Sequence, residues 1–154
     1  MKTLVLFASK HGCTKTAAQQ LAGQLQNVDL FDIAQKSFSL ADYDTVIVGG
    51  SIYVGRIDKA LTQYLTSNLA TLLQKRIGLF VCCGLAEKAI EQLGVAFPKG
   101  LVQAAVVKGY FGYGFDHLSF AEKMICKVMK APIGKTEIRT QDIASFARDI
   151  GQTA

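Results

Sequence analysis

The segment that decides the fold is residues 3–14, TLVLFASKHGCT. Residues 3–8 form a short apolar run, as in a strand that is buried on both faces of a sheet. A polar loop over residues 9–13 follows at once, and residues 14–26 then carry apolar side chains at helical spacing. A buried strand that leads through a short loop into a helix is typical of a parallel α/β sheet.

The same alternation continues along the chain. We expect further strands over residues 28–33, 44–49, 76–83 and 103–109, and helices over residues 58–73, 87–97, 117–130 and 140–150. Parallel strands of this kind are joined by right-handed crossovers. The sequence therefore predicts an α/β protein with an open five-stranded parallel sheet in the order 2-1-3-4-5 and helices on both faces, with residues 1–154 as a single domain.

The composition is that of a globular, cytoplasmic protein. Half of the 154 residues are hydrophobic and 19% are charged, so the chain can bury a core without a disulfide or metal. No apolar run approaches the roughly 18 residues of a membrane span, and the run at residues 4–8 is too short for a signal peptide. The four cysteines have no C-x-x-C spacing, which favours buried free thiols, and we predict no metal site.

The formal net charge of +5 favours acidic partners. Nucleic acid is one such partner, but the basic residues are spread along the chain without a Lys/Arg-rich tract. A phosphate-binding regulatory or nucleic-acid-binding module is therefore the hypothesis that we rank last, and we expect no nucleic-acid partner.

Two loops are the places to search for a site. In a sheet of this order, ligands bind at the carboxyl ends of the first and third strands, which places a site at residues 9–14 and 49–56. In the first loop, backbone N–H groups and the positive end of a helix dipole converge, and Ser9 and Thr14 add hydroxyl donors. Neither G-x-x-x-x-G-K-[ST] nor G-x-G-x-x-G is present, which favours a single phosphate over a triphosphate or pyrophosphate. The alternative is that Ser9 and Thr14 only cap the helix.

Residues 5–14, VLFASKHGCT, followed by Ala18 and Leu21, resemble the phosphate signature of the flavodoxin family. The resemblance implies a flavodoxin-like fold and FMN as the cofactor. It also implies which residues cradle the FMN phosphate: Ser9, Lys10, His11, Gly12, Cys13 and Thr14.

The resemblance extends the site to two further loops. The second comprises Gly50, Ser51, Ile52, Tyr53, Val54 and Gly55, where the ring of Tyr53 would stack on the isoalloxazine; the alternative is a tyrosine packed on the following helix. The third comprises Cys83, Gly84 and Leu85, whose backbone would reach the flavin edge. Flavodoxins that carry electrons usually hold a second aromatic in the third loop, whereas Leu85 and Ala86 stand here. One face of the ring would then be open to a substrate. Core thiols, rather than redox-active ones, remain the favoured interpretation of Cys82 and Cys83.

Further scattered matches resemble a subgroup, the flavodoxin-domain protoporphyrinogen IX dehydrogenases that pass electrons to menaquinone. The matches fall at residues 50–52, 55, 115–116, 127–130, 134, 136, 140 and 146–150. That family carries a long basic insertion between its fourth and fifth strands. Residues 84–103 of this chain provide only a short helix and turn instead.

The function that these observations favour is an FMN-dependent oxidoreductase, similar to protoporphyrinogen dehydrogenase. It would pass electrons between a small reduced substrate and a quinone or other acceptor. The alternative is a soluble flavodoxin-type electron carrier that docks on a partner reductase. No pattern in the chain identifies a catalytic acid or base.

A membrane contact is a further expectation. The helix expected over residues 117–130 has a core stripe that includes Val128, and it carries Lys123, Lys127 and Lys130 beside Phe120 and Met124. Such a helix would lie peripherally on an anionic membrane. The alternative is an ordinary packed helix with a solvated lysine face.

Overall fold

The computed structural model describes residues 1–9, 12–35, 37–53, 55–114, 124, 128 and 137–152. Its central sheet is parallel and has the order β2-β1-β3-β4-β5, which confirms the predicted order. The strands are β1 (Thr3–Ala8), β2 (Val28–Asp32), β3 (Thr45–Ser51), β4 (Arg76–Cys82) and β5 (Ala105–Tyr110). A separate antiparallel pair, β6 (Gly112–Tyr113) and β7 (Glu137–Ile138), follows β5.

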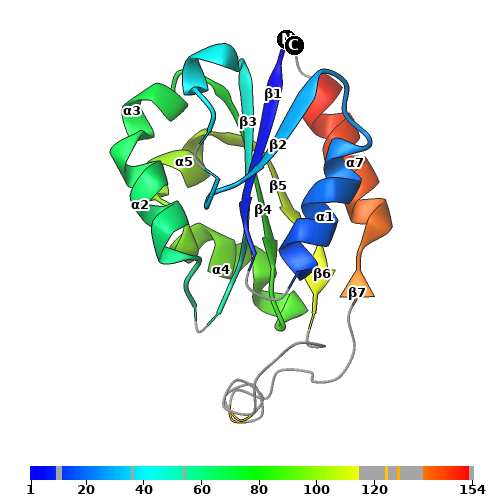
Figure 1. Cartoon of the computed structure of the whole chain (residues 1–154). Helices are drawn as coiled ribbons and strands as arrows, with labels where there is room; N and C mark the ends of the chain where they lie inside the picture. The colour runs from blue at the N-terminus through cyan, green and yellow to red at the C-terminus, as the bar shows by residue number, and fades with distance from the viewer. Residues whose placement is uncertain are drawn as a thin grey trace.

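Helices cover both faces of the sheet (Figure 1). One face carries α1 (Cys13–Ala22) and α7 (Thr140–Gln152). The other carries α2 (Lys59–Ser67), α3 (Leu69–Leu72), α4 (Ala89–Ala96) and α5 (Lys99–Ala104). Short 3-10 turns lie at η1 (Leu40–Asp42) and η2 (Ala86–Lys88). Within the described residues, none of these helices has the length and apolar character needed to cross a membrane.

The alternation of side chains along β1 builds two cores at once. Leu4 and Leu6 point into the cluster beneath α2 and α4, and Val5 and Phe7 point into the cluster beneath α1 and α7. These side chains are almost completely buried. A strand with both faces covered has no polar face, and this explains the continuous apolar run in the sequence.

A stack of phenylalanines fills the core on the α1 side. The rings of Phe80 and Phe111 stack with their centroids 4.5 Å apart, and Phe146 meets Phe111 edge-on at 5.2 Å. The ring of Phe80 lies directly over Gly49 of β3, where a Cβ atom would be 1.9 Å from the Cζ atom of Phe80. Only glycine allows this close approach of ring and backbone.

The structure divides some elements differently from the sequence pattern. The helix expected over residues 58–73 is split at Asn68, whose side-chain Nδ2 donates to the Tyr64 carbonyl 2.8 Å away and ends α2. The strand expected from residue 103 begins instead at Ala105, because residues 99–104 form α5. The sequence pattern did not predict α5 or the β6–β7 pair.

The expected helix over residues 117–130 lies outside the described residues, apart from Met124 and Val128. The placement of Val128 in a core stripe was wrong, because its side chain is 80% exposed. Met124, which the pattern sets off that stripe, is 51% exposed.

Replacing Gly49 with Ala tests the packing of the phenylalanine stack. We expect Gly49→Ala to lower the free energy of unfolding by about 1–3 kcal/mol, because the new methyl group overlaps a ring that Phe111 holds from its other side. The control is Gly94→Ala in α4, where an added Cβ meets no atom within 4 Å. Gly94→Ala should leave the stability unchanged or raise it by about 0.5–1 kcal/mol. Urea denaturation followed by circular dichroism measures both, and equal stabilities would contradict the packing argument.

Candidate functional site

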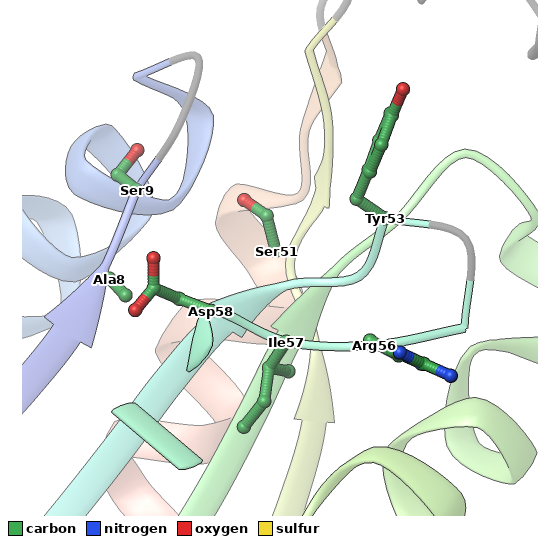
Figure 2. Close-up of a pocket in the computed structure, with 7 residues that line it drawn as sticks. All are labelled: Ala8, Ser9, Ser51, Tyr53, Arg56, Ile57 and Asp58. Carbon is green, nitrogen blue, oxygen red and sulfur yellow. The ribbon is translucent and has the colours of Figure 1, made fainter. Parts of the chain in front are cut away.

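A cavity of about 720 Å³ opens at the carboxyl ends of β1 and β3 (Figure 2). This volume lies within the range of roughly 300–1,000 Å³ that holds most small-molecule ligands. The strand order reverses between β1 and β3, and this is the edge of the sheet at which ligands bind in such folds. The lining residues are Ala8, Ser9, Ser51, Tyr53, Arg56, Ile57 and Asp58.

The first loop wraps tightly around the beginning of α1. Gly12 is the residue before the helix and has φ of +85°, a conformation that disfavours residues with a Cβ atom. Its N–H donates to the Ser9 hydroxyl oxygen at 3.0 Å, and its carbonyl accepts from the Thr16 N–H at 2.9 Å. Among the described residues, no side-chain hydrogen bond caps the amino end of α1, so neither Ser9 nor Thr14 acts as its cap. The amino end of α1 is therefore left with its positive dipole at the edge of the cavity.

A hydrogen bond between two hydroxyl groups links α1 to β3. Thr14 is fully buried, and its Oγ1 atom lies 2.5 Å from the Oγ atom of Ser51. Each hydroxyl has one proton and two lone pairs, so this bond uses only one of the two protons. Ser51 also lines the cavity, so when Thr14 is the donor of this bond the Ser51 hydroxyl keeps its own proton for an acceptor there.

The second loop closes with a tight turn. The Tyr53 N–H donates to the Arg56 carbonyl at 2.9 Å, and the Arg56 N–H donates to the Tyr53 carbonyl at 3.1 Å. The Ile52 N–H donates to the Cys82 carbonyl at 2.9 Å and keeps the start of the turn on the sheet. Figure 2 shows the Tyr53 ring rising from this turn at one end of the cavity.

Helix α2 begins shortly after this turn. Asp58 precedes α2, and its Oδ1 atom accepts from the Leu61 N–H at 3.1 Å. Ala8, Ile57 and Asp58 line the cavity but lie outside the two loops that the sequence marks, and Arg56 ends the second loop without a role assigned to it from the sequence. A sequence signal was available for Asp58, since an aspartate directly before an amphipathic helix is a typical N-cap.

The thiols lie beside the hydroxyl pair. Cys13, the first residue of α1, and Cys82, the last of β4, are buried free thiols of the same core cluster. A hydrogen bond between the two thiols lowers the pKa of Cys13 and raises that of Cys82. Burial raises the pKa of Cys83. The position of Cys13 at the amino end of a helix also favours its thiolate.

The third loop is held from behind by β5 and β6. The Cys83 N–H donates to the Gly112 carbonyl at 3.0 Å, and the Tyr110 hydroxyl donates to the Cys83 carbonyl at 3.1 Å. Burial raises the pKa of Tyr110, which keeps this hydroxyl protonated as a donor. Cys83, Gly84 and Leu85 do not line the cavity.

The predicted site residues thus fall into three groups. The cavity brings together Ser9, Ser51 and Tyr53, with Gly12, Cys13 and Thr14 directly behind them. Gly50 is buried within β3, Ile52 packs against the core on the α2 side, and Gly55 lies in the turn. Lys10, His11 and Val54 lie outside the described residues.

Comparison with known proteins identifies the family. A family model described as a flavodoxin domain matches residues 4–139, so the chain belongs to the flavodoxin-domain family. The chain is also 28% identical over 173 residues to an Escherichia coli K12 protein named protoporphyrinogen IX dehydrogenase (quinone), a match that covers 97% of this chain and 94% of the relative.

Solved structures share the fold at low identity. A Streptococcus flavodoxin (strain TIGR4) matches with a TM-score of 0.61 and 18% identity over 100% of both chains. A Fusobacterium nucleatum flavodoxin bound to flavin mononucleotide has a TM-score of 0.61 and 13% identity over 97% of both chains. Rubredoxin oxygen:oxidoreductase from Desulfovibrio gigas matches with a TM-score of 0.58 and 18% identity, and the match covers 99% of this chain but 37% of that protein.

A double-mutant cycle tests the Thr14–Ser51 pair. We expect Thr14→Val and Ser51→Ala to be non-additive in the flavin-free protein, with a coupling of about 0.5–1.5 kcal/mol in the free energy of unfolding, since either change breaks the same hydrogen bond. Urea unfolding of the wild type, both single variants and the double variant gives this value. Strictly additive effects would mean that the two hydroxyls do not stabilise each other.

Proposed function

We propose that the chain binds FMN in this cavity and works as an oxidoreductase that passes electrons between a small reduced substrate and a quinone or other acceptor. The observation that carries the proposal is the Gly12 turn, which leaves the uncapped amino end of α1 at the cavity where β1 and β3 end. The name of the Escherichia coli relative and the flavin mononucleotide in the Fusobacterium structure support it.

The first loop fits a phosphate group. A helix amino end with unpaired N–H groups stabilises a doubly negative phosphate through its dipole and its donors. The Ser9 hydroxyl accepts from Gly12 and still has its own proton to donate, so it would bind the phosphate without giving up its place in the turn. When Thr14 donates to Ser51, the Ser51 hydroxyl is a further donor on the same side.

The second loop fits a flat ring. Tyr53 presents an aromatic face at the cavity, held by the paired backbone hydrogen bonds of its turn. When bound, FMN supplies the electron transfer. The chain's own residues would bind the phosphate, orient the ring and leave one face open above Leu85 and Ala86.

A soluble electron carrier is the second candidate. The full-length match to a flavodoxin that consists of the same fold favours it. The net charge of +5 and the aliphatic residues of the third loop favour the oxidoreductase, because a substrate needs access to the ring. Steady-state turnover of a small reduced substrate with a quinone distinguishes the two, since a carrier needs its partner protein for turnover.

The identity of the cofactor is the first test. We expect purified protein, reconstituted with flavins, to bind one FMN and to prefer it over FAD, because the first loop accommodates a single phosphate. Heat denaturation and chromatography of the released flavin measure this. Release of FAD, or of no flavin, would reject the proposal.

The hydroxyl of Thr14 gives a residue-level test. We expect Thr14→Ala to weaken FMN binding about tenfold or more, because the Ser51 hydroxyl at the cavity loses the partner that positions it. Hydrogen bonds to charged groups contribute roughly 1.5–3 kcal/mol, and tenfold corresponds to about 1.4 kcal/mol. Thr14→Ser keeps the hydroxyl and should restore most of the affinity. Thr71→Ala, at an exposed position of α3, is the control. Quenching of flavin fluorescence gives each dissociation constant, and an unchanged value for Thr14→Ala would place the phosphate elsewhere.

A further inference from the structure

Arg56 differs from the other arginines in its surroundings. Arg139 and Arg148 form ion pairs with Asp142 and Asp149, and the Arg76 Nε donates to the Ile150 carbonyl at 2.9 Å. Arg56 lines the cavity with an exposed side chain. In the described part of the chain, no side chain forms an ion pair or hydrogen bond with its guanidinium.

The direction of the Arg56 side chain separates it from the phosphate end of the cavity. In Figure 2, Arg56 extends away from Ser9 and Ser51, whereas Asp58 points to the opposite side, toward Ala8. The Asp58 carboxylate is occupied by the Leu61 N–H at the start of α2. The two charged side chains of the cavity lining thus point to opposite sides, and the described residues offer the Arg56 guanidinium no ion-pair partner.

Backbone hydrogen bonds, and not contacts of the side chain, fix the position of Arg56. The two backbone hydrogen bonds with Tyr53 fix the turn, and Ile57 packs into the core beneath it. A charged side chain that is exposed at a cavity, and whose own backbone holds it in place, is suited to bind a charged group from outside.

We propose that Arg56 forms an anion-binding subsite at the rim of the cavity, and that it selects aromatic redox compounds bearing a carboxylate or sulfonate over neutral compounds of the same shape. The inference rests on the proposed function for the redox chemistry, and it names the substrate class of that site. The guanidinium is a planar donor that pairs with both oxygens of a carboxylate or sulfonate. The net charge of +5 would attract the same compounds from a distance.

The test compares two quinones that differ only in charge. Protein loaded with FMN and reduced is mixed with naphthoquinone sulfonate or with naphthoquinone, each of which takes up two electrons and two protons and becomes the hydroquinone. We expect Arg56→Gln to slow reoxidation by the sulfonate about fivefold at low salt, the effect of one nearby charge in water. The neutral quinone should change less than about twofold, and the difference should vanish in about 1 M NaCl, where the Debye length is about 3 Å.

Two variants serve as controls. Arg56→Lys keeps the charge and should recover most of the rate with the sulfonate. Lys99→Gln removes one charge at an exposed position on α5, away from the cavity, and should affect neither quinone. Flavin fluorescence gives the FMN affinity of all three variants, and the quinone rates are compared at FMN concentrations that saturate each of them.

A measurement on the flavin-free protein separates this inference from the proposed function. The side-chain Nε–H signal of Arg56, identified by its loss in Arg56→Gln, should shift in NMR spectra on addition of naphthalene sulfonate and not of uncharged naphthalene methanol. If the sulfonate shifts no such signal, or if Arg56→Gln affects both quinones equally, the subsite is rejected while FMN binding stands. If FMN does not bind, the proposed function fails and the NMR titration alone decides on the subsite.

Discussion

The parallel pairing of β1 with β3 is the constraint on which the site depends. Its register sets Ala8 opposite Gly50, so the loops that follow the two strands leave the sheet side by side. Because both faces of β1 are packed, a shift by one residue would turn Val5 and Phe7 out of one core and Leu4 and Leu6 out of the other. The burial of apolar side chains therefore fixes the position of the polar groups at the strand ends.

The hydrogen bond between the Thr14 and Ser51 hydroxyls connects the paired strands to the first loop of the site. Ser51 lies opposite Cys82 in the β3–β4 pairing, and Cys82 shares a hydrogen bond with Cys13, the neighbour of Thr14. Two adjacent residues of α1 thus contact two adjacent strands. This buried contact sets the amino end of α1 against the sheet edge, and a helix amino end held in place can favour an anion without reorganising.

The sequence predicted the sheet order and the loops of the site because both depend on short-range patterns. The apolar runs specify buried strands, and the glycine at position 12 with its flanking hydroxyls marks a tight turn before a helix. The role of Arg56 and the existence of α5 were not predicted, for a different reason. The position of Arg56 at the cavity follows from how the turn at Tyr53 closes, and α5 lies in a stretch whose apolar residues suit a strand as well as a helix. Tertiary packing determines how such a turn closes and whether such a stretch becomes a strand or a helix. A local sequence pattern carries no information about this packing.

The fold is shared by proteins with different tasks, so the distinction between carrier and enzyme has to come from the rim of the cavity. A carrier benefits from a covered ring, because electrons pass through its edge to a partner protein and water or small oxidants are kept away. An enzyme needs an exposed ring face and a group that orients the substrate against it. The third loop of this chain carries the aliphatic residues Leu85 and Ala86. Arg56 lines the cavity beside the Tyr53 turn, and its guanidinium has no ion-pair partner in the described part of the chain. Both features concern what approaches from outside, and neither contributes to holding the phosphate. A cation at the rim of the cavity would act on an incoming anionic substrate rather than on the cofactor phosphate.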